Sequence, residues 1–357
     1  MNNKWIKSPL FHIAWILLLG GIYVFYKVNA RLNPGPSITD SPTTIIGINH
    51  VGISVKDLDK MVAFYQQATN YPLLERTHIA SDEAADRLFG QAGIQYEKAI
   101  LKGPNMLLEL TEFSNQTDTL IRNMPPQGPG MTHTCYQSAD ANSGYDMFKQ
   151  AGVSMLSRGD EPVDLGGYGV TYAYAYDPEG NMVELEQMSE TLIKLKIGTE
   201  WAKQHPVWMT QVALISPDLP QLTAYYQTLL AIEPFRVGSF KDNPKFDEIG
   251  NLDNLAFDAA WFGMDTQGKK IELMQYVNPP TPRPTKRKAT DLGYTFSLEV
   301  LDIQEEYNRL KKLGVDFLSE PQKLEEFWTV LAHDVDGNLF SLRQAIEKES
   351  RYSLRNF

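Results

Sequence analysis

Apolar and polar positions follow one arrangement that occurs twice along the chain. Residues 49–75 contain an apolar strand pattern, an aspartate, an amphipathic helix pattern and a proline before the next strand, and residues 210–236 repeat this order. The two prolines, Pro72 and Pro234, lie 162 positions apart. A repeated order of strand and helix patterns indicates that the chain has two structurally similar halves.

Each half contains a second, weaker repeat. Every helix pattern follows one strand and precedes three strand-like runs, of which the last lie at residues 107–113, 183–188, 271–276 and 340–345. Gly152 and Gly314 end two of the helix patterns and precede valine, which predicts left-handed caps at the C-terminal ends of both helices. Together these patterns predict an α+β fold made of four βαβββ modules.

The length of the chain and its linkers predict two domains. A chain of 357 residues is too long for one ordinary core and fits two domains of about 150 residues each. We expect a separate segment at residues 1–35, a first domain at 44–188, a linker at 189–208 and a second domain at 209–345.

The N-terminal segment differs in kind from the rest of the chain. Residues 9–26 contain no formally charged side chain and approach the roughly twenty apolar residues that span a bilayer as a helix. We interpret them as a transmembrane anchor, with a cleaved signal peptide as the alternative. Positive charge is slightly greater before this segment, where Lys4, Lys7 and the α-amine lie, than after it. This predicts a single-pass membrane protein with domains outside the cytoplasm, or a periplasmic or secreted protein if the segment is cleaved.

Charge and cysteine content exclude some functions. The net charge of -11 and the pI near 5.1 argue against a general nucleic-acid-binding protein, because neutralising phosphates requires clustered lysine and arginine. A single cysteine, Cys135, excludes an intramolecular disulfide framework and a cysteine-based zinc site. The composition leaves the oligomeric state open.

Three features together resemble a known superfamily. A histidine lies in the first strand of a module, a glutamate lies in its last strand, and the turn Asp177-Pro-Glu-Gly-Asn181 precedes a closing Val-Glu-Leu-Glu-Gln run. Over residues 44–345 this pattern resembles the vicinal oxygen chelate superfamily. That group contains glyoxalase I, methylmalonyl-CoA epimerase, extradiol ring-cleaving dioxygenases and bleomycin-resistance proteins. The resemblance implies that the modules form two glyoxalase-like domains.

The superfamily's metal-ligand positions can be carried over residue by residue. In the first two modules they are His50, Glu109, His133 and Glu184, and in the last two they are Gln211, Glu272, Phe296 and Ser341. Two imidazoles and two carboxylates suit Ni, Zn, Fe, Mn or Co and leave positions open for a small substrate with vicinal oxygens. We therefore expect one divalent ion on the first four residues, with Glu184 or Glu109 as the base that transfers a proton.

Two pairings of the modules are compatible with the sequence. Direct pairing joins modules one with two and three with four, which gives one complete His, Glu, His, Glu site and a C-terminal half that binds no metal. Crossed pairing joins one with four and two with three, which brings His133 and Glu184 together with Gln211 and Glu272. We expect direct pairing, because it keeps a complete ligand set in one half.

Three functions remain open at this point. The first is a metal-dependent lyase or isomerase similar to glyoxalase I or the epimerase, and retention of Glu109 as a second carboxylate favours it. The second is an Fe(II) ring-cleaving dioxygenase, which uses two histidines and one carboxylate. The third is a protein that binds a small molecule without catalysis, as in bleomycin resistance.

Overall fold

The four predicted βαβββ modules are present in the part of the chain that the computed structural model describes, which comprises residues 35–80, 82–116, 122–167, 169–265 and 268–357. The first module consists of β1 (Ile45–Ser54), α2 (Leu58–Thr69), β2 (Leu73–Ile79), α3 (Glu83–Phe89), β3 (Tyr96–Lys102) and β4 (Leu107–Phe113). The second consists of β5 (Gly130–Ala139), α4 (Gly144–Ala151), β6 (Ser154–Met155), β7 (Val163–Asp164), β8 (Val170–Tyr176) and β9 (Met182–Met188).

The second half repeats this order after a helical linker of α5 (Glu190–Leu192), η4 (Ile193–Ile197) and α6 (Thr199–Gln204). The third module consists of β10 (Val207–Ile215), α7 (Leu219–Leu230), β11 (Arg236–Phe240), α8 (Pro244–Gly250), β12 (Ala256–Gly263) and β13 (Lys270–Asn278). The fourth consists of β14 (Gly293–Val300), α9 (Ile303–Lys312), β15 (Asp316–Phe317), β16 (Gln322–Leu324), β17 (Phe327–His333) and β18 (Leu339–Ala345). Short 3₁₀ turns, η2 (Ile38–Asp40) and η5 (Leu354–Asn356), flank the modules. The short helices α3 and α8 are additions to the predicted pattern.

Local sequence signals explain where the main helices begin and end. Asp57, Asp218 and Asp302 cap the N-termini of α2, α7 and α9, where their side chains accept a hydrogen bond from a backbone N–H in the first turn. Gly152 and Gly314 follow α4 and α9 with φ angles of 100° and 84°. Both predicted left-handed caps are therefore confirmed.

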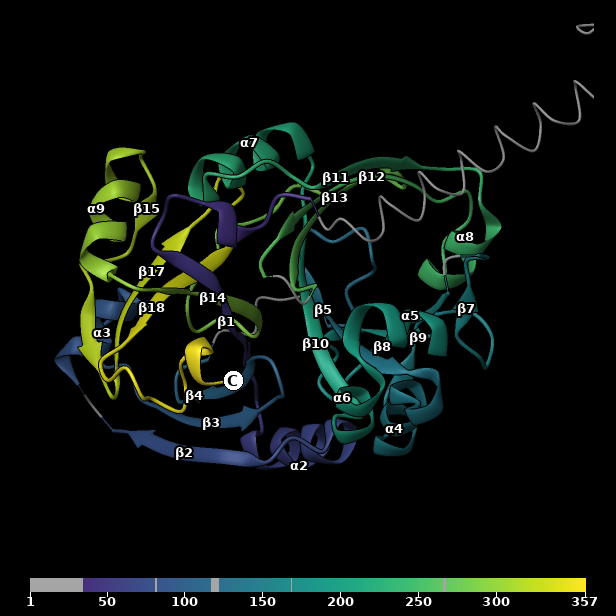
Figure 1. Cartoon of the computed structure of the whole chain (residues 1–357). Helices are drawn as coiled ribbons and strands as arrows, with labels where there is room; N and C mark the ends of the chain where they lie inside the picture. Colours follow the sequence, from purple (N-terminus) through teal and green to yellow (C-terminus); the bar gives the residue numbers. More distant parts are fainter. Residues whose placement is uncertain (1–34, 81, 117–121, 168, 266–267) are drawn as a thin grey trace, which may run out of the picture. The chain divides into compact units, whose positions relative to one another are not determined.

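The strands form two sheets, and each sheet combines modules from both halves of the chain (Figure 1). Sheet 1 joins modules one and four, with the order β15-β17-β18-β14-β1-β4-β3-β2, and sheet 2 joins modules two and three, with the order β11-β12-β13-β10-β5-β9-β8-β6. The first strands of the paired modules are antiparallel at the centre of each sheet, β1 with β14 and β5 with β10. The pairing is thus crossed, and the expected direct pairing is wrong.

The helices connect the modules differently from the strands. Helix α2 of module one packs against α4 of module two, and Arg309 of α9 donates to the carbonyl oxygens of Thr228 and Leu229 in α7. One large hydrophobic cluster contains side chains from both sheets and from α2, α4, α7 and α9. Modules one and two, and modules three and four, therefore contact each other through their helices. Modules one and four, and modules two and three, pair through their strands.

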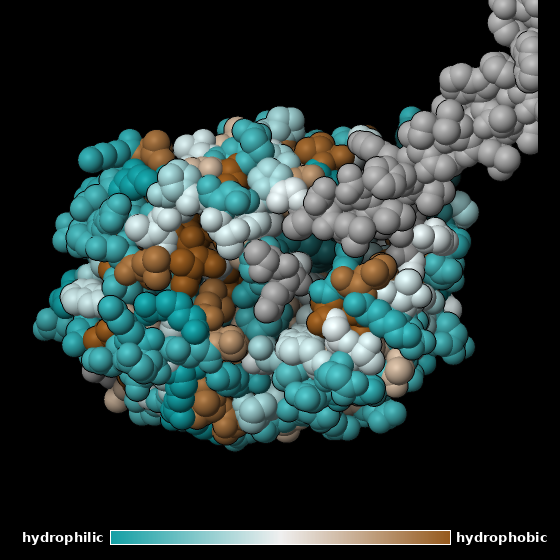
Figure 2. Space-filling model, in the orientation of Figure 1, coloured by the Kyte–Doolittle hydropathy of each residue, from teal (hydrophilic) through white to brown (hydrophobic). Residues whose placement is uncertain are grey.

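The surface in the view of Figure 2 is mainly hydrophilic, with hydrophobic residues gathered over β14, β17 and β18. No helix among the described residues is long and apolar enough to cross a membrane. The predicted membrane segment, residues 9–26, lies outside the described residues. The expected membrane localisation, with domains outside the cytoplasm, is corrected on this finding and is not retained.

Candidate metal centre

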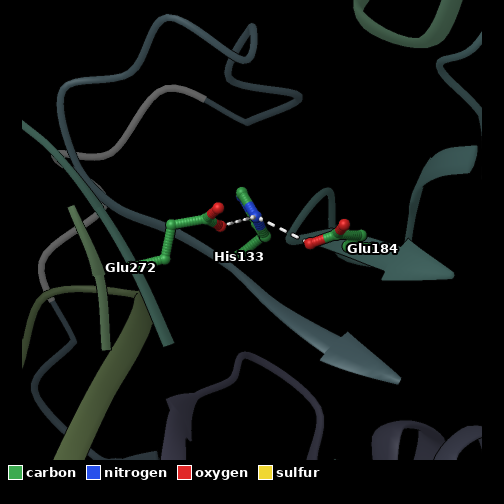
Figure 3. Close-up of side chains that lie close together, drawn as sticks. All are labelled: His133, Glu184 and Glu272. Atoms are coloured by element: carbon green, nitrogen blue, oxygen red, sulfur yellow. Dashed lines mark ion pairs between the residues drawn. The ribbon is translucent and has the colours of Figure 1, made fainter. Parts of the chain in front are cut away.

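Four polar side chains from four strands meet on the concave face of sheet 2. They are His133 on β5, Glu184 on β9, Gln211 on β10 and Glu272 on β13. The Nε2 atom of His133 lies 3.2 Å from Oε2 of Glu184 and 3.8 Å from Oε2 of Glu272 (Figure 3). The Nε2 atom of Gln211 donates to Oε2 of Glu272 at 2.8 Å and to Oε2 of Glu184.

Strand register explains why these four residues converge. Cys135 pairs with Glu184 across β5 and β9, and Ala213 pairs with Glu272 across β10 and β13. His133 lies two residues before Cys135, the partner of Glu184. Gln211 likewise lies two residues before Ala213, the partner of Glu272. Because side chains alternate across a strand, residues two positions apart share a face. The histidine or glutamine consequently lies on the same face as the glutamate of its own module.

Neighbouring side chains hold the cluster in place. Oγ1 of Thr132 lies 2.9 Å from Nδ1 of His133, which leaves Nε2 directed at the carboxylates. The indole N–H of Trp261 donates to Oε1 of Glu272 at 2.6 Å, and the ring of Tyr174 lies 5.1 Å from that of His133. In known metal sites, hydrogen bonds from neighbouring groups to the ligand side chains fix the orientation of those side chains.

The electrostatics of the cluster are dominated by the two carboxylates. Burial by itself lowers the pKa of His133, but Glu184 and Glu272 outweigh it and raise this pKa to about 9. The pKa of Glu272 is lowered, because His133 and Lys270 oppose the effect of its burial. Two carboxylates directed at one imidazole therefore favour a bound cation there, and a divalent ion would displace the proton of His133.

The residues present fit a divalent metal ion. One ligand atom each from His133, Glu184 and Glu272 lies within 4.8 Å of the others. Nε2 of His133 is buried and makes no hydrogen bond within the described part of the chain, although two carboxylates lie close to it. A 180° rotation of the Gln211 amide would bring its oxygen to the same point, as a ligand atom for the ion. A second group, Cys135, Glu184 and Glu186, is a poorer candidate, because burial raises the pKa of the Cys135 thiol and keeps it protonated.

Glu184, Gln211 and Glu272 of this cluster line a cavity of about 140 Å³. Its lining is largely aromatic and apolar, with Tyr172, Tyr174, Phe240, Phe257, Trp261 and Tyr276 among the contributing residues. Two cationic residues, Lys270 and Arg236, also line it, and Arg236 lies over the Trp261 ring with its guanidinium carbon 4.6 Å from the ring centroid. A mostly apolar cavity with a few charged groups is typical of small-molecule sites.

Comparison with known proteins supports one family. The profile of the Glyoxalase/Bleomycin resistance protein/Dioxygenase superfamily matches residues 47–185. An ethylmalonyl-CoA/methylmalonyl-CoA epimerase from Cereibacter sphaeroides is 30% identical over 145 residues, which cover 40% of this chain and 97% of the epimerase. The chain belongs to this superfamily.

Solved structures of the superfamily share the fold over most of the chain. Glyoxalase I from Zea mays has a TM-score of 0.55 and 21% identity, with 84% of this chain and 92% of the maize chain covered. A putative dioxygenase from Bacillus subtilis has a TM-score of 0.52 and 13% identity, with coverage of 85% and 86%. The predicted superfamily membership is confirmed, and these structures support its fold.

The other two predicted ligands lie apart from the cluster, on the concave face of sheet 1. His50 and Glu109 line a second cavity there, and Nη2 of Arg343 donates to Oε2 of Glu109 at 2.9 Å. The sequence therefore identified His133 and Glu184 within the cluster, whereas Gln211 and Glu272 belonged only to the crossed alternative. The expectation that the C-terminal half supplies no residue to the site is wrong in this geometry.

One position carried over from the superfamily pattern is also corrected. Phe296 was expected to be the first-strand position of module four, but it packs in the hydrophobic core against Phe340. Ser297 pairs with Ser341, and so the residue two positions earlier, Thr295, is the structural equivalent of Gln211. Thr295 lines the sheet 1 cavity. A shift of one residue moves a side chain to the opposite face, which explains the error.

Proposed function

We propose that the chain is a metal-dependent lyase or isomerase that acts on a small molecule with vicinal oxygens. The observation that carries this proposal is the convergence of His133, Glu184, Gln211 and Glu272, of which the last three line one cavity. One imidazole nitrogen and three oxygen donors suit a borderline divalent ion such as Ni, Zn, Fe, Mn or Co.

A divalent ion held by these residues would hold two adjacent substrate oxygens and stabilise negative charge that develops on them. The protein must then remove a proton from the neighbouring carbon. Oε1 of Glu272 accepts from the Trp261 indole, which holds this carboxylate as a ligand. Within the described part of the chain no hydrogen bond holds Oε1 of Glu184, so we assign the proton transfer to Glu184.

The rest of the cavity favours a substrate with an apolar body and an anionic group. Burial alone would lower the pKa of Lys270, but Glu186 and Glu272 raise it, so this side chain stays an ammonium close to the proposed metal position. Arg236 provides a second cation. Aromatic side chains in the cavity lining reduce the access of water to the reacting atoms, which strengthens electrostatic interactions there.

Among the superfamily's chemistries, proton transfer is favoured over ring cleavage. Non-haem Fe(II) oxygenases use two histidines and one carboxylate, whereas this cluster has a single histidine. The epimerase relative supports proton transfer next to a carbonyl group as the reaction class. Hydrogen exchange on a bound thioester distinguishes catalysis from binding without catalysis.

The test is deuterium incorporation by the full-length, metal-loaded chain. We expect methylmalonyl-CoA, or another thioester with an acidic α-hydrogen and a neighbouring oxygen group, to exchange that hydrogen in deuterated water, as followed by NMR. Glu184→Gln should slow the exchange by at least about 100-fold, the scale of general acid–base catalysis. Glu109→Gln, the matched change on sheet 1, should leave the exchange rate unchanged.

Two outcomes would contradict the proposal. Oxygen consumption with a catechol, without hydrogen exchange on thioesters, would favour a dioxygenase. Tight binding of these thioesters without any exchange, in protein with full metal content, would favour a binding protein.

A further inference from the structure

The cavity on sheet 1 lies where the proposed metal centre lies on sheet 2, but its lining differs. Its charged side chains are Lys98, Glu109, Glu325 and Arg343. Its apolar side chains include Leu88, Phe89, Phe113, Leu324, Leu331 and Leu339. The cavity measures about 80 Å³, and hydrophobic residues gather over the neighbouring strands β14, β17 and β18 (Figure 2). A small ligand with polar and apolar parts fits this combination.

Arg343 is the main indication of a ligand. Its side chain is only 7% exposed, and its Nη2 atom donates to Glu109. Its Nε and Nη1 atoms are buried and make no hydrogen bond to any described residue. The guanidinium carbon lies 4.3 Å from the centroid of the Phe327 ring, which fixes the side chain without satisfying its N–H groups. Buried N–H donors without acceptors are costly, so an acceptor in the cavity is expected.

Among the described residues, Glu325 carries an unpaired acceptor that complements the unpaired donors of Arg343. Its Oε2 atom accepts from the ammonium of Lys98, whose side chain is 5% exposed. Its Oε1 atom is buried and has no hydrogen-bond partner within the described residues. Arg343 and Glu325 both line this cavity, and within the described part of the chain they carry unpaired buried donors and an unpaired buried acceptor, respectively. A ligand that satisfies both must itself carry an acceptor and a donor.

We propose that this cavity binds a small hydroxycarboxylate, whose carboxylate accepts from Arg343 and whose hydroxyl donates to Oε1 of Glu325. The carbon chain contacts the apolar lining. A metal ion is disfavoured here, because the carboxylates of Glu109 and Glu325 already form ion pairs with Arg343 and Lys98. This binding does not depend on activity at the site on sheet 2.

The experiment compares racemic 2-hydroxybutyrate with butyrate, which lacks only the hydroxyl. Binding to the full-length chain is measured by calorimetry at constant ionic strength. It is measured on chelator-treated protein, because a hydroxycarboxylate also chelates metals, and on the Glu272→Gln variant of sheet 2. We expect saturable binding of 2-hydroxybutyrate with several-fold higher affinity than butyrate, and no change in Glu272→Gln.

Variants of the sheet 1 cavity locate the binding. Arg343→Gln, or the double variant Glu109→Gln/Arg343→Gln if the single one does not fold, should abolish it. Ser341→Leu leaves Arg343 intact but adds bulk to the cavity lining, and it should weaken binding at least tenfold. Glu325→Ala should remove the difference between 2-hydroxybutyrate and butyrate.

Several results would overturn the proposal. One is the absence of saturable binding of 2-hydroxybutyrate by the wild-type chain. Another is unchanged binding in both Ser341→Leu and the double variant, which would place the ligand elsewhere. Equal affinities of 2-hydroxybutyrate and butyrate for the wild-type chain would remove the role assigned to Glu325.

Discussion

The concave faces of the two sheets contain the same module positions, but different side chains pair with the carboxylates on each face. On sheet 2, the carboxylates of Glu184 and Glu272 both face the imidazole of His133 and, despite its burial, raise its pKa to about 9, and Lys270 lines the cavity on this sheet. On sheet 1, Arg343 forms an ion pair with Glu109 beside His50. On sheet 2 the carboxylates are thus paired with a histidine, which can give up its proton to a divalent ion, whereas on sheet 1 Glu109 is paired with an arginine, which keeps its charge. The presence of a histidine and a glutamate at the ligand positions of a module is thus insufficient to predict a metal site.

The two histidines show the same difference. Burial and the nearby Arg343 lower the pKa of His50 to about 3, while Glu184 and Glu272 raise that of His133 to about 9 against the effect of burial. Both side chains are buried at equivalent positions of their modules. Because both histidines are buried, the difference between their two pKa values comes from the neighbouring charges.

The largest expected effect that separates the two faces is on metal content. We expect about one divalent ion per wild-type chain, nearly none in His133→Ala or Glu272→Ala, and an unchanged amount in His50→Ala, as measured by elemental analysis. Chelation should lower the melting temperature of the wild-type chain, because a ligand that binds only the folded state stabilises it. The melting temperature of His133→Ala should not respond. Metal loss in His50→Ala alone would contradict this assignment.

The second effect concerns the ion pair on sheet 1. Arg343→Leu leaves the Glu109 carboxylate buried without its partner, and removing one member of a buried pair costs about 3–5 kcal/mol. Urea unfolding should show this loss in the free energy of unfolding. The double variant Glu109→Gln/Arg343→Leu should regain a large part of it, because no buried charge is then left unpaired. An equal loss in both variants would show that packing, not charge, dominates.

Much of this comparison could be predicted from the sequence, and the rest could not for physical reasons. The modules and the glycine caps follow from periodicity and local signals, whereas His133 and Glu184 were assigned from the resemblance to the superfamily. Strand pairing between distant modules does not, because the first strand of every module carries a similar apolar pattern. The register of β14 was misplaced by one residue, since Phe296 and Thr295 are both plausible strand residues. The role of Arg343 depends on tertiary contacts that no local motif encodes.

A smaller effect is expected on the pH dependence of stability in metal-free protein. The folded pKa of His133 lies above the ordinary value of 6.5, so its contribution is complete below pH 6.5 and is lost as pH rises through about 9. The folded pKa of His50 lies below 6.5, so its contribution is present above pH 6.5 and is lost as pH falls toward about 3. His133→Gln should flatten the alkaline side of the stability profile and His50→Gln the acidic side. Histidine NMR titrations provide the check, and similar pKa values for the two residues would contradict it.

The smallest expected effect tests the helical contacts between consecutive modules. The hydroxyl of Tyr65 in α2 donates to Oδ2 of Asp177 at 2.9 Å, and that of Tyr226 in α7 donates to Oδ2 of Asp334 at 3.2 Å. These two bonds connect module one to two and module three to four, across the boundary between the sheets. Tyr65→Phe should lower the free energy of unfolding by about 1–2 kcal/mol, since it removes a buried hydrogen bond to a carboxyl group.

The matched variant Tyr226→Phe should cost less than Tyr65→Phe. Its hydrogen bond is longer, and burial raises the pKa of Asp334 to about 6, so this acceptor already loses its charge in mildly acidic solution. Urea unfolding of both variants at pH 7 and pH 5 gives the comparison. The loss of unfolding free energy in Tyr226→Phe should be smaller at pH 5 than at pH 7, because a protonated Asp334 is a weaker acceptor. A cost of Tyr226→Phe that equals that of Tyr65→Phe and is independent of pH would show that the two contacts are equivalent in strength.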